Sequence, residues 1–406
     1  MTLIMLISSI FPLWGVLLSI IFIFVNPSKW RKVLPLLVFG FFVGAYAFVP
    51  PDNGFDLYRY LPMIEQYGKL SFMEALTMDG DILYASHTLF WICGRLHLPH
   101  LAPAITTAGV YAAAFYMTCD TAERYYGLRW IGPVIIFQAA MMPYIMITNN
   151  VRNVFGLVMV ALAVYLDIVK KDRKWYVFVL YATGILSHHS AFVFVVLRLL
   201  CGAVKKIFAV IVIFPLFFSS IIYFFNANIN RLPFSGALGT TIRGIIWRMY
   251  GYLTYRDVAY AVRSLKSRTV MIDRVVMLIG MIMAIIIIFH FLRKGKSYAM
   301  DDSRIYSFVG MIAVMTISCN VFAMPNFWRF AAAFYAIFGV VAVPLLVSYK
   351  KMPIMIKIEP YIYTLIGAFS LLFQYVRYDR TFLLDWLTSG FLTNWITILN
   401  DFFKAI

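Results

Sequence analysis

Two adjacent histidines carry the clearest chemical signal in the sequence. His188 and His189 lie in GILSHHSAFVF, residues 184–194, which is otherwise apolar. Histidine titrates near neutral pH and can accept a proton from a hydroxyl group. In an apolar segment it can instead hydrogen-bond a neighbouring helix. Both residues are candidate catalytic bases, and the sequence leaves open which one faces a site, because consecutive helical side chains point about 100° apart.

Two arginines form a second candidate group. Arg152 in TNNVRNVFG and Arg329 in MPNFWRFAAAFY each lie beside asparagine, between two apolar runs. A charge at membrane depth costs about 2.5 to 3.5 kcal/mol and usually faces a partner or a cavity. Guanidinium matches phosphate oxygens with a fork of donors. We expect both arginines to bind pyrophosphate and Asn150 to contact sugar; the alternative is that the arginines reach the membrane interface.

The segment 227–269 is rich in arginine. It holds six arginines against one acid, Asp257. We expect Arg248 and Arg256 to assist in binding pyrophosphate. The alternative is an amphipathic helix that lies on lipid headgroups.

The segment 52–81 is acidic and aromatic. Within it, DLYRY places Asp56 four residues before Tyr60. We expect Tyr60 to bind sugar and Asp56 to orient sugar or act as a base. An aspartate that begins an interfacial aromatic helix is the equally favoured alternative.

Neither a metal nor another cofactor is expected. The four cysteines are scattered singly, and there is no HExxH motif or Cys/His cluster. The remaining histidines are assigned no role: His87, His97, His100 and His290.

The composition predicts an all-α, polytopic membrane bundle that forms one domain, 1–406. Of the 406 residues, 63% are hydrophobic and 13% are charged, well beyond the apolar content of soluble domains. We expect about 11 to 13 membrane segments. The stronger candidates are 3–25, 33–51, 101–119, 130–151, 175–197, 207–230, 305–328 and 330–349, and the weaker ones are 82–97, 153–169, 275–292, 360–376 and 386–400.

Lysine predicts the orientation of the chain. The net charge is +17, but no soluble basic domain is present to bind nucleic acid. Five lysine-rich loops are expected to be cytoplasmic: 26–32, 170–174, 205–206, 293–296 and 350–357. The loops 52–81 and 227–269 are then outer loops. This parity requires that one segment does not cross, and 82–97 is the shortest.

As a set, these residues resemble a known family. The motifs are D-x-x-x-Y (Asp56, Tyr60), the arginine of NNVRN (Arg152), H-x-S-A (His188, Ser190, Ala191) and the late Arg329. Their order and spacing are similar to those of EpsG-type polymerases of bacterial exopolysaccharide, within the wider Wzy-type group. The family's arginine is often followed by glutamine, where this chain has Asn153.

The resemblance implies a polymerase that joins repeat units carried on undecaprenyl pyrophosphate at the outer face of the cytoplasmic membrane. Chain-length regulators and export proteins are the implied partners. Pyrophosphate leaves as a stable anion, so a base and cationic groups suffice, and no acid is needed for the leaving group. The alternatives are a glycosyltransferase that uses a polyprenyl-phosphate sugar and depends on Asp56, a flippase for lipid-linked sugars, and an assembly subunit.

Overall fold

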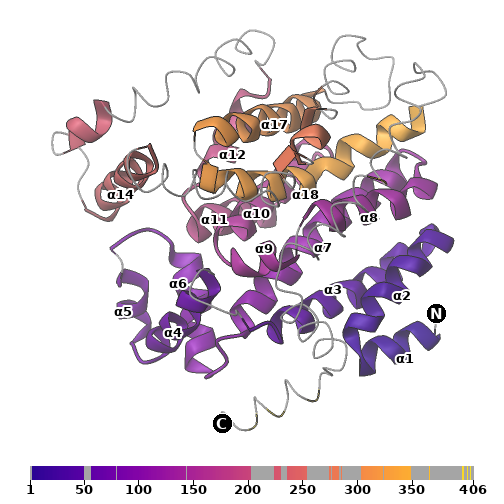
Figure 1. Ribbon diagram of the computed structural model, residues 1–406, viewed down its shortest axis with the longest axis horizontal. Coiled ribbons are helices and arrows are strands. Elements are labelled where there is room, and N and C mark those ends of the chain that lie inside the picture. Colours follow the sequence, from indigo (N-terminus) through magenta and orange to yellow (C-terminus); the bar gives the residue numbers. More distant parts are fainter. Residues whose placement is uncertain are drawn as a thin grey trace.

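A computed structural model describes residues 2–49, 56–78, 80–142, 144–202, 224–229, 236–253, 303–322 and 324–348, with parts of 274–285 and residues 365, 396, 400 and 403. Among these residues the secondary structure is helical and contains no strand, which confirms the expected all-α class (Figure 1). The helices of the first half are α1 (Thr2–Ile10), α2 (Pro12–Val25), α3 (Trp30–Tyr46), α4 (Asp56–Gly68), α5 (Phe72–Thr77), α6 (Tyr84–Arg95), α7 (Leu101–Arg124), α8 (Ile131–Met141) and α9 (Tyr144–Asn149). They are followed by α10 (Asn153–Ile168), α11 (Trp175–Ser187), α12 (Ala191–Leu200), α14 (Gly236–Leu253), α17 (Arg304–Phe322) and α18 (Met324–Ser348).

The core lies where α7, α10 and α18 pack together, with α17 and α8 beside α18. Small residues allow this close packing. An added Cβ at Gly339 of α18 would lie 1.9 Å from the Thr118 hydroxyl of α7. Within the described residues, one helix, Phe327–Val347, is long and apolar enough to cross a membrane by length and composition.

The bundle has two chemically different ends. At one, Arg31 in the first turn of α3 pairs with Glu123 near the end of α7, and Lys170 after α10 pairs with Asp120. At the other, the end of α9 meets the start of α4. We call the end that carries Lys170 the lysine end. We call the end that carries residues 149–153 the arginine end, after Arg152. The lysine-rich loops 26–32 and 170–174 therefore lie together, opposite residues 149–153.

The run 3–25 does not form one helix. It breaks at Phe11, and Pro12 begins α2, because proline cannot donate the backbone hydrogen bond needed within a helix. An added Cβ at Gly15 would lie 2.5 Å from Cβ of Ser8. Residues seven apart in a continuous helix are separated by about 10 Å, so α1 folds back on α2 (Figure 1).

The run 175–197 is also broken. Helix α11 ends at Ser187, and His188 is extended, with φ −161° and ψ 136°. Near the end of α12, Arg198 lies 2.6 Å from Asp167, a residue at the lysine end of α10. Helix α12 therefore runs back toward the end from which α11 came. We call α11, α12 and the turn between them the histidine hairpin.

A glycine contact seats the histidine hairpin on α10. An added Cβ at Gly156 of α10 would lie 2.7 Å from the carbonyl oxygen of Gly184 in α11. The two backbones are therefore too close for any side chain between them. This contact is near the arginine end, next to the turn that carries the histidines.

The predicted outer loop 52–81 contains α4 and α5, which pack with α6. Their shared apolar cluster includes Leu57, Ile64, Tyr67 and Phe90. Helix α6 has 12 residues, which is about 18 Å and shorter than the roughly 30 Å hydrocarbon core. Whether 82–97 crosses the membrane stays a prediction.

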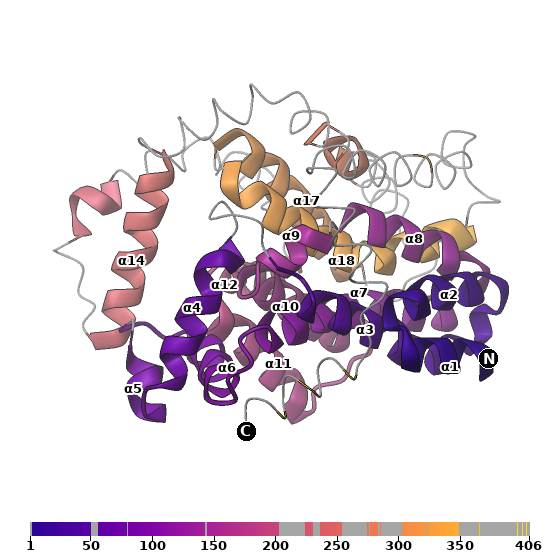
Figure 2. The same ribbon diagram turned by 60° about the horizontal axis from the view of Figure 1, so that its bottom comes forward.

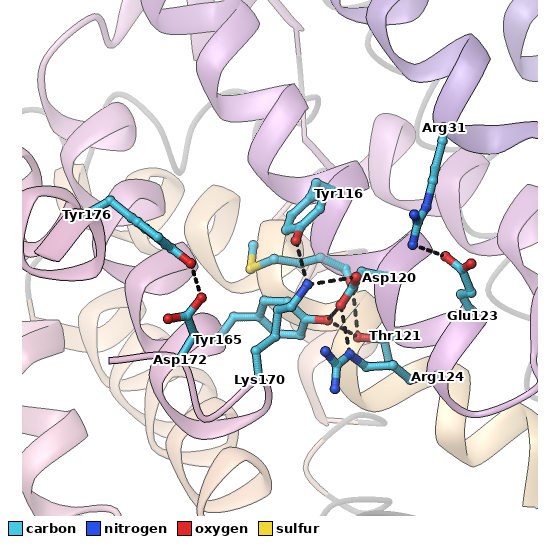
Figure 3. Close-up of polar contacts among 11 residues, drawn as sticks. Arg31, Tyr116, Asp120, Thr121, Glu123, Arg124, Tyr165, Lys170, Asp172 and Tyr176 are labelled. Carbon is cyan, nitrogen blue, oxygen red and sulfur yellow. Dashed lines mark hydrogen bonds and ion pairs between the residues drawn. The ribbon is translucent and has the colours of Figure 1, made fainter. Parts of the chain in front are cut away.

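A polar network joins α7 and α10 at the lysine end (Figure 3). Asp120 accepts hydrogen bonds from Tyr165 at 2.5 Å, Arg124 at 2.9 Å and Lys170 at 3.0 Å. Lys170 also donates to Tyr116 at 2.9 Å. Burial opposes ionisation of Asp120, but the hydrogen bonds from Tyr165, Lys170 and Arg124 outweigh it and lower the pKa of Asp120.

The lowered pKa of Asp120 predicts that the connection between α7 and α10 weakens in acid. Because the folded-state pKa lies below the ordinary 3.8, the ionised carboxylate stabilises the fold above about pH 4. That stability is lost as the pH falls through the lower, folded-state pKa. In Asp120→Asn we expect a loss of about 2 kcal/mol at pH 7, less than for a fully buried pair because Arg124 is 40% exposed.

Thermal unfolding of purified protein between pH 3 and pH 8 measures this difference. Glu123→Gln is the control, since the Arg31–Glu123 pair is 67% and 44% exposed and should contribute under about 1 kcal/mol. Equal stability of the two variants at pH 7 would contradict the assignment.

Candidate functional site

The turn between α9 and α10 lies at the centre of the arginine end. The side chain of Asn149 accepts a hydrogen bond of 2.8 Å from the backbone N–H of Leu57. This bond satisfies one of the backbone donors that a helix leaves unpaired at its start. It also places the first turn of α4, with Asp56, against residues 149–153. Helix α4 contacts α9, and both can be followed in Figure 2.

Arg329, near the start of α18, is held by this turn and by α4. Its Nε donates to Asn150 Oδ1 at 3.0 Å, and its Nη2 lies 3.2 Å from Asp56 Oδ2. The other Asp56 oxygen contacts Arg59. These two contacts use two of the five N–H donors of the Arg329 guanidinium. The side chain is 21% exposed, so it remains within reach of a ligand.

Arg152 belongs to the same turn. Its Nη2 donates to the hydroxyl of Tyr60 at 3.1 Å, and its guanidinium carbon lies 4.9 Å from the centre of that ring and 5.8 Å from the centre of the Phe90 ring. Contacts with aromatic faces stabilise a cation while leaving donors on its rim. Tyr60, expected to bind sugar, thus supports Arg152 in the described structure.

His188 lies at the tip of the histidine hairpin and is joined to α10. Its Nδ1 lies 2.8 Å from the hydroxyl oxygen of Ser190, which donates to Asn153 Oδ1 at 2.8 Å. Asn153 is the first residue of α10 and follows Arg152 directly. One turn therefore carries the support for His188 and one of the two arginines.

His189 points to a different partner. Its Nε2 lies 3.9 Å from Asp81 Oδ2, and the other Asp81 oxygen lies 3.4 Å from Nε2 of His87. The two candidate bases thus have separate surroundings. Through Ser190 and Asn153, His188 is the histidine joined to the turn that carries Arg152.

Seven of the predicted site residues lie in the described structure, and contacts join them in two groups. The arginine end collects Asp56, Tyr60, Asn150, Arg152 and Arg329, whereas the histidine hairpin carries His188 and His189. The side chain of Arg248 in α14 and the whole of Arg256 lie outside the described residues. The sequence pattern predicts no role for His87 and leaves the role of Asn153 open.

The missed residues gave weak sequence signals. Ser190 stands in the H-x-S-A motif, but the motif does not indicate that its hydroxyl reaches Asn153 on another helix. Nothing in the spacing pointed from Asp81 to His87 and His189. Among the described residues, no group of three His, Cys, Asp or Glu side chains has an arrangement suited to a metal ion.

Comparison with protein-family models, curated proteins and solved structures gave no match. The chemistry of the site therefore follows from its own geometry. It has a histidine supported on one side, two guanidinium groups, one from the turn before α10 and one from α18, and one carboxylate shared between arginines.

The bridging position of Arg329 predicts that lysine cannot replace it. A lysine amine is a single point charge and cannot donate to both Asn150 and Asp56 in the geometry of a planar fork. We expect Arg329→Lys to weaken binding of inorganic pyrophosphate about tenfold or more, as for the loss of a charged hydrogen bond. Isothermal titration calorimetry on purified protein measures this.

Arg59→Lys is the matched control. Arg59 contacts the same Asp56 but its side chain is 70% exposed, so its replacement should change binding less than about twofold. If both variants bound pyrophosphate like the wild type, Arg329 would have no part in an anion site.

Proposed function

We propose that this protein is a multi-pass membrane polymerase that transfers a growing polysaccharide from undecaprenyl pyrophosphate to a sugar hydroxyl of another lipid-linked repeat unit. The observation that carries the proposal is the Asn150–Asn153 turn. The turn supports His188 through Ser190 and Asn153. It includes Arg152, and its Asn150 accepts a hydrogen bond from Arg329 of α18. A base and two cations at one place match the chemistry of glycosyl transfer with a pyrophosphate leaving group.

The exposed surface supports a membrane location. Large apolar side chains recur with helical spacing on the outside of α2: Trp14, Leu17, Ile21 and Phe24 are between 46% and 56% exposed. On α11, Trp175 and Phe178 are 75% and 65% exposed. A stripe of this kind is unfavourable in water and favourable in lipid.

The proposed topology keeps the 11 to 13 membrane segments expected from the sequence.

The proposed orientation follows from lysine. Loops 26–32 and 170–174 share one end, and lysine-rich loops face the cytoplasm. The arginine end then faces outward, where lipid-linked repeat units are polymerised in the family that the sequence resembles. We therefore propose that the protein lies in the bacterial cytoplasmic membrane, with its site toward the outer face.

His188 is the proposed base. Ser190 has one hydroxyl hydrogen, and the 2.8 Å bond to Asn153 uses it. The oxygen of Ser190 then accepts from Nδ1–H of His188 at 2.8 Å, which leaves the lone pair on Nε2. This tautomer is assigned from the hydrogen-bond pattern. The Ser190 backbone N–H also lies 3.2 Å from Nδ1, but a protonated Nδ1 cannot accept from it, so this longer contact is not a hydrogen bond in the assigned tautomer.

In the proposed reaction, a sugar hydroxyl attacks the anomeric carbon of the chain on the donor lipid. Its proton moves to Nε2 of His188 as the new C–O bond forms. The bond from the anomeric carbon to the phosphate oxygen breaks, and its electron pair leaves with the pyrophosphate. Arg152 and Arg329 stabilise the developing charge, which is the usual function of fixed cations at a leaving group.

Asp56 is proposed as a positioning residue for Arg329. One of its oxygens contacts Arg329 and the other contacts Arg59, so both oxygens accept from guanidinium groups. This arrangement favours His188 over Asp56 as the base. The alternative is a glycosyltransferase that depends on Asp56. That enzyme would need the Asp56 carboxylate at the reacting hydroxyl. Contacts with a chain-length regulator and export proteins remain part of the proposal.

The test is polymerisation by purified protein in liposomes that contain an undecaprenyl-pyrophosphate repeat unit, read as a ladder on a gel. We expect a ladder from the wild type, with or without EDTA, and a rate about 10²- to 10⁴-fold lower in His188→Ala, the usual contribution of a general base. The control variant is His97→Asn, because His97 is exposed and follows the last residue of α6. Its rate should equal that of the wild type.

The outcomes separate the alternatives. A normal ladder from His188→Ala together with none from Asp56→Asn would favour the aspartate-dependent glycosyltransferase. Folded wild type that makes no polymer but moves labelled lipid across the bilayer would favour the flippase. Either result would overturn the proposal.

A further inference from the structure

Arg329 already holds an anion in the described structure. Its Nη2 donates to Asp56 Oδ2 at 3.2 Å, and the two side chains are 21% and 23% exposed. Carboxylate and phosphate oxygens accept from a guanidinium group in the same way. Asp56 therefore occupies a donor of Arg329 that is suited to a pyrophosphate oxygen.

Asp56 has a second partner on its own helix. Arg59, one turn later on α4, contacts the other carboxylate oxygen. Residues three apart on a helix are neighbours, so this pair lies within α4, whereas the pair with Arg329 joins α4 to α18. Asp56 can therefore leave Arg329 and keep Arg59 as its cation.

Arg329 has a contact that does not depend on Asp56. Its Nε donates to Asn150 Oδ1 at 3.0 Å, and Asn150 is 7% exposed. The amide nitrogen of Asn150 donates to a backbone carbonyl of α9 at 2.8 Å, which fixes the orientation of the amide. On either side of Arg329, Trp328 and Phe330 are buried. These contacts keep the guanidinium group in place when the carboxylate leaves.

A bound anion acts differently on the two pairs of Asp56. Pyrophosphate on Arg329 brings several negative charges close to the carboxylate, and like charges at short range repel. The repulsion weakens the contact between Asp56 and Arg329 and leaves Arg59 as the favourable partner. Binding of pyrophosphate and release of Asp56 are therefore coupled.

We propose that Asp56 is an internal anion that occupies Arg329 until pyrophosphate replaces it. This inference rests on the proposed function, which assigns pyrophosphate to Arg329. The pyrophosphate of the donor lipid takes Nη2 of Arg329, and Asp56 stays with Arg59. After the transfer, Asp56 returns to Arg329 and displaces the lipid pyrophosphate. Only ion pairs and hydrogen bonds are exchanged in these steps.

The direction of one affinity change tests the exchange. Asparagine has the shape of aspartate without its charge, so Asp56→Asn competes less strongly for Arg329. We expect isothermal titration calorimetry to show that this variant binds inorganic pyrophosphate about five- to tenfold more tightly than the wild type does. If Asp56 only supported Arg329, the variant would bind more weakly. Unchanged or weaker binding would overturn the inference.

Glu65→Gln is the matched control. Glu65 is an exposed carboxylate on the same helix, more than two turns after Asp56. Its distance of about 14 Å along the axis exceeds the screening length of about 8 Å at physiological salt. Its replacement should change pyrophosphate binding less than about twofold, and thermal unfolding checks that both variants keep the fold. Equal tightening in the two variants would reflect net charge alone and would overturn the inference.

A double-mutant cycle separates exchange from simple repulsion. Arg59→Gln removes the second partner, so Asp56 stays on Arg329 and pyrophosphate binding should weaken about tenfold. In the Asp56→Asn background, no carboxylate remains to be released, and the same change should weaken binding less than about threefold. Equal effects in both backgrounds would show that Asp56 acts only through its charge, which would overturn the exchange.

Chain extension in liposomes gives a kinetic readout that a supporting role would not produce. We expect Asp56→Asn to lower both KM for the lipid-linked repeat unit and kcat, because tighter binding without displacement slows release of the lipid pyrophosphate. A raised KM with unchanged kcat would overturn the inference. A wild type that makes no polymer would overturn the proposed function, whereas tighter binding of pyrophosphate by Asp56→Asn would still support the exchange at Arg329.

Discussion

The hydrogen bond from Ser190 to Asn153 is the contact on which the arrangement at the arginine end depends. It ties the tip of the histidine hairpin to the first residue of α10, next to Arg152. The close approach of Gly156 and Gly184 lets the two backbones come near enough for this bond. From the same turn, Asn150 reaches Arg329 and Asn149 reaches the start of α4. Short polar side chains thus bring α4, α10, α12 and α18 to one place.

A break in an apolar helix needs compensation, because it exposes backbone groups that lipid cannot hydrogen-bond. At the hairpin tip, the turn satisfies its own backbone. The N–H groups of Ala191 and Phe192 donate to the carbonyls of His188 and His189 at 3.0 and 3.1 Å. The carbonyl of Ser187 accepts from Ser86. Consequently two imidazoles can be presented at the arginine end without leaving that backbone unpaired.

The opposite end of the molecule stabilises this arrangement. Asp120 joins α7 to the end of α10 through Lys170 and Tyr165, and Arg198 joins α12 to α10 through Asp167. Helix α10 is thus fixed near its last residues by ionic hydrogen bonds and near its first by Asn153. A helix held at both ends positions the side chains at its start more accurately than a loop would.

The sequence predicted that Arg152 and Arg329 would lie at the end opposite the lysine-rich loops. Those loops and the apolar runs between them define on which side of the membrane each helix end lies. The sequence alone therefore predicts that Asp56, Arg152 and Arg329 lie on the same side of the membrane. The two reversals, at Phe11 and at His188, were not predicted. Hydropathy counts apolar residues but cannot detect a turn when both arms are equally apolar. The pairing of Asp81 with His87 depends on how α6 packs against the hairpin, which a single sequence does not encode in its spacing.

A distance between two labelled positions tests whether α11 and α12 form the histidine hairpin. Trp175 is 75% exposed at the start of α11, and Gly202 is exposed just after α12. Spin labels at these two positions in purified, detergent-solubilised protein can be measured by double electron–electron resonance. The hairpin predicts a distance under about 25 Å, since both positions lie at the lysine end. A continuous helix from 175 to 202 would place the two labels about 40 Å apart at 1.5 Å per residue. A distance near that value would rule out the hairpin.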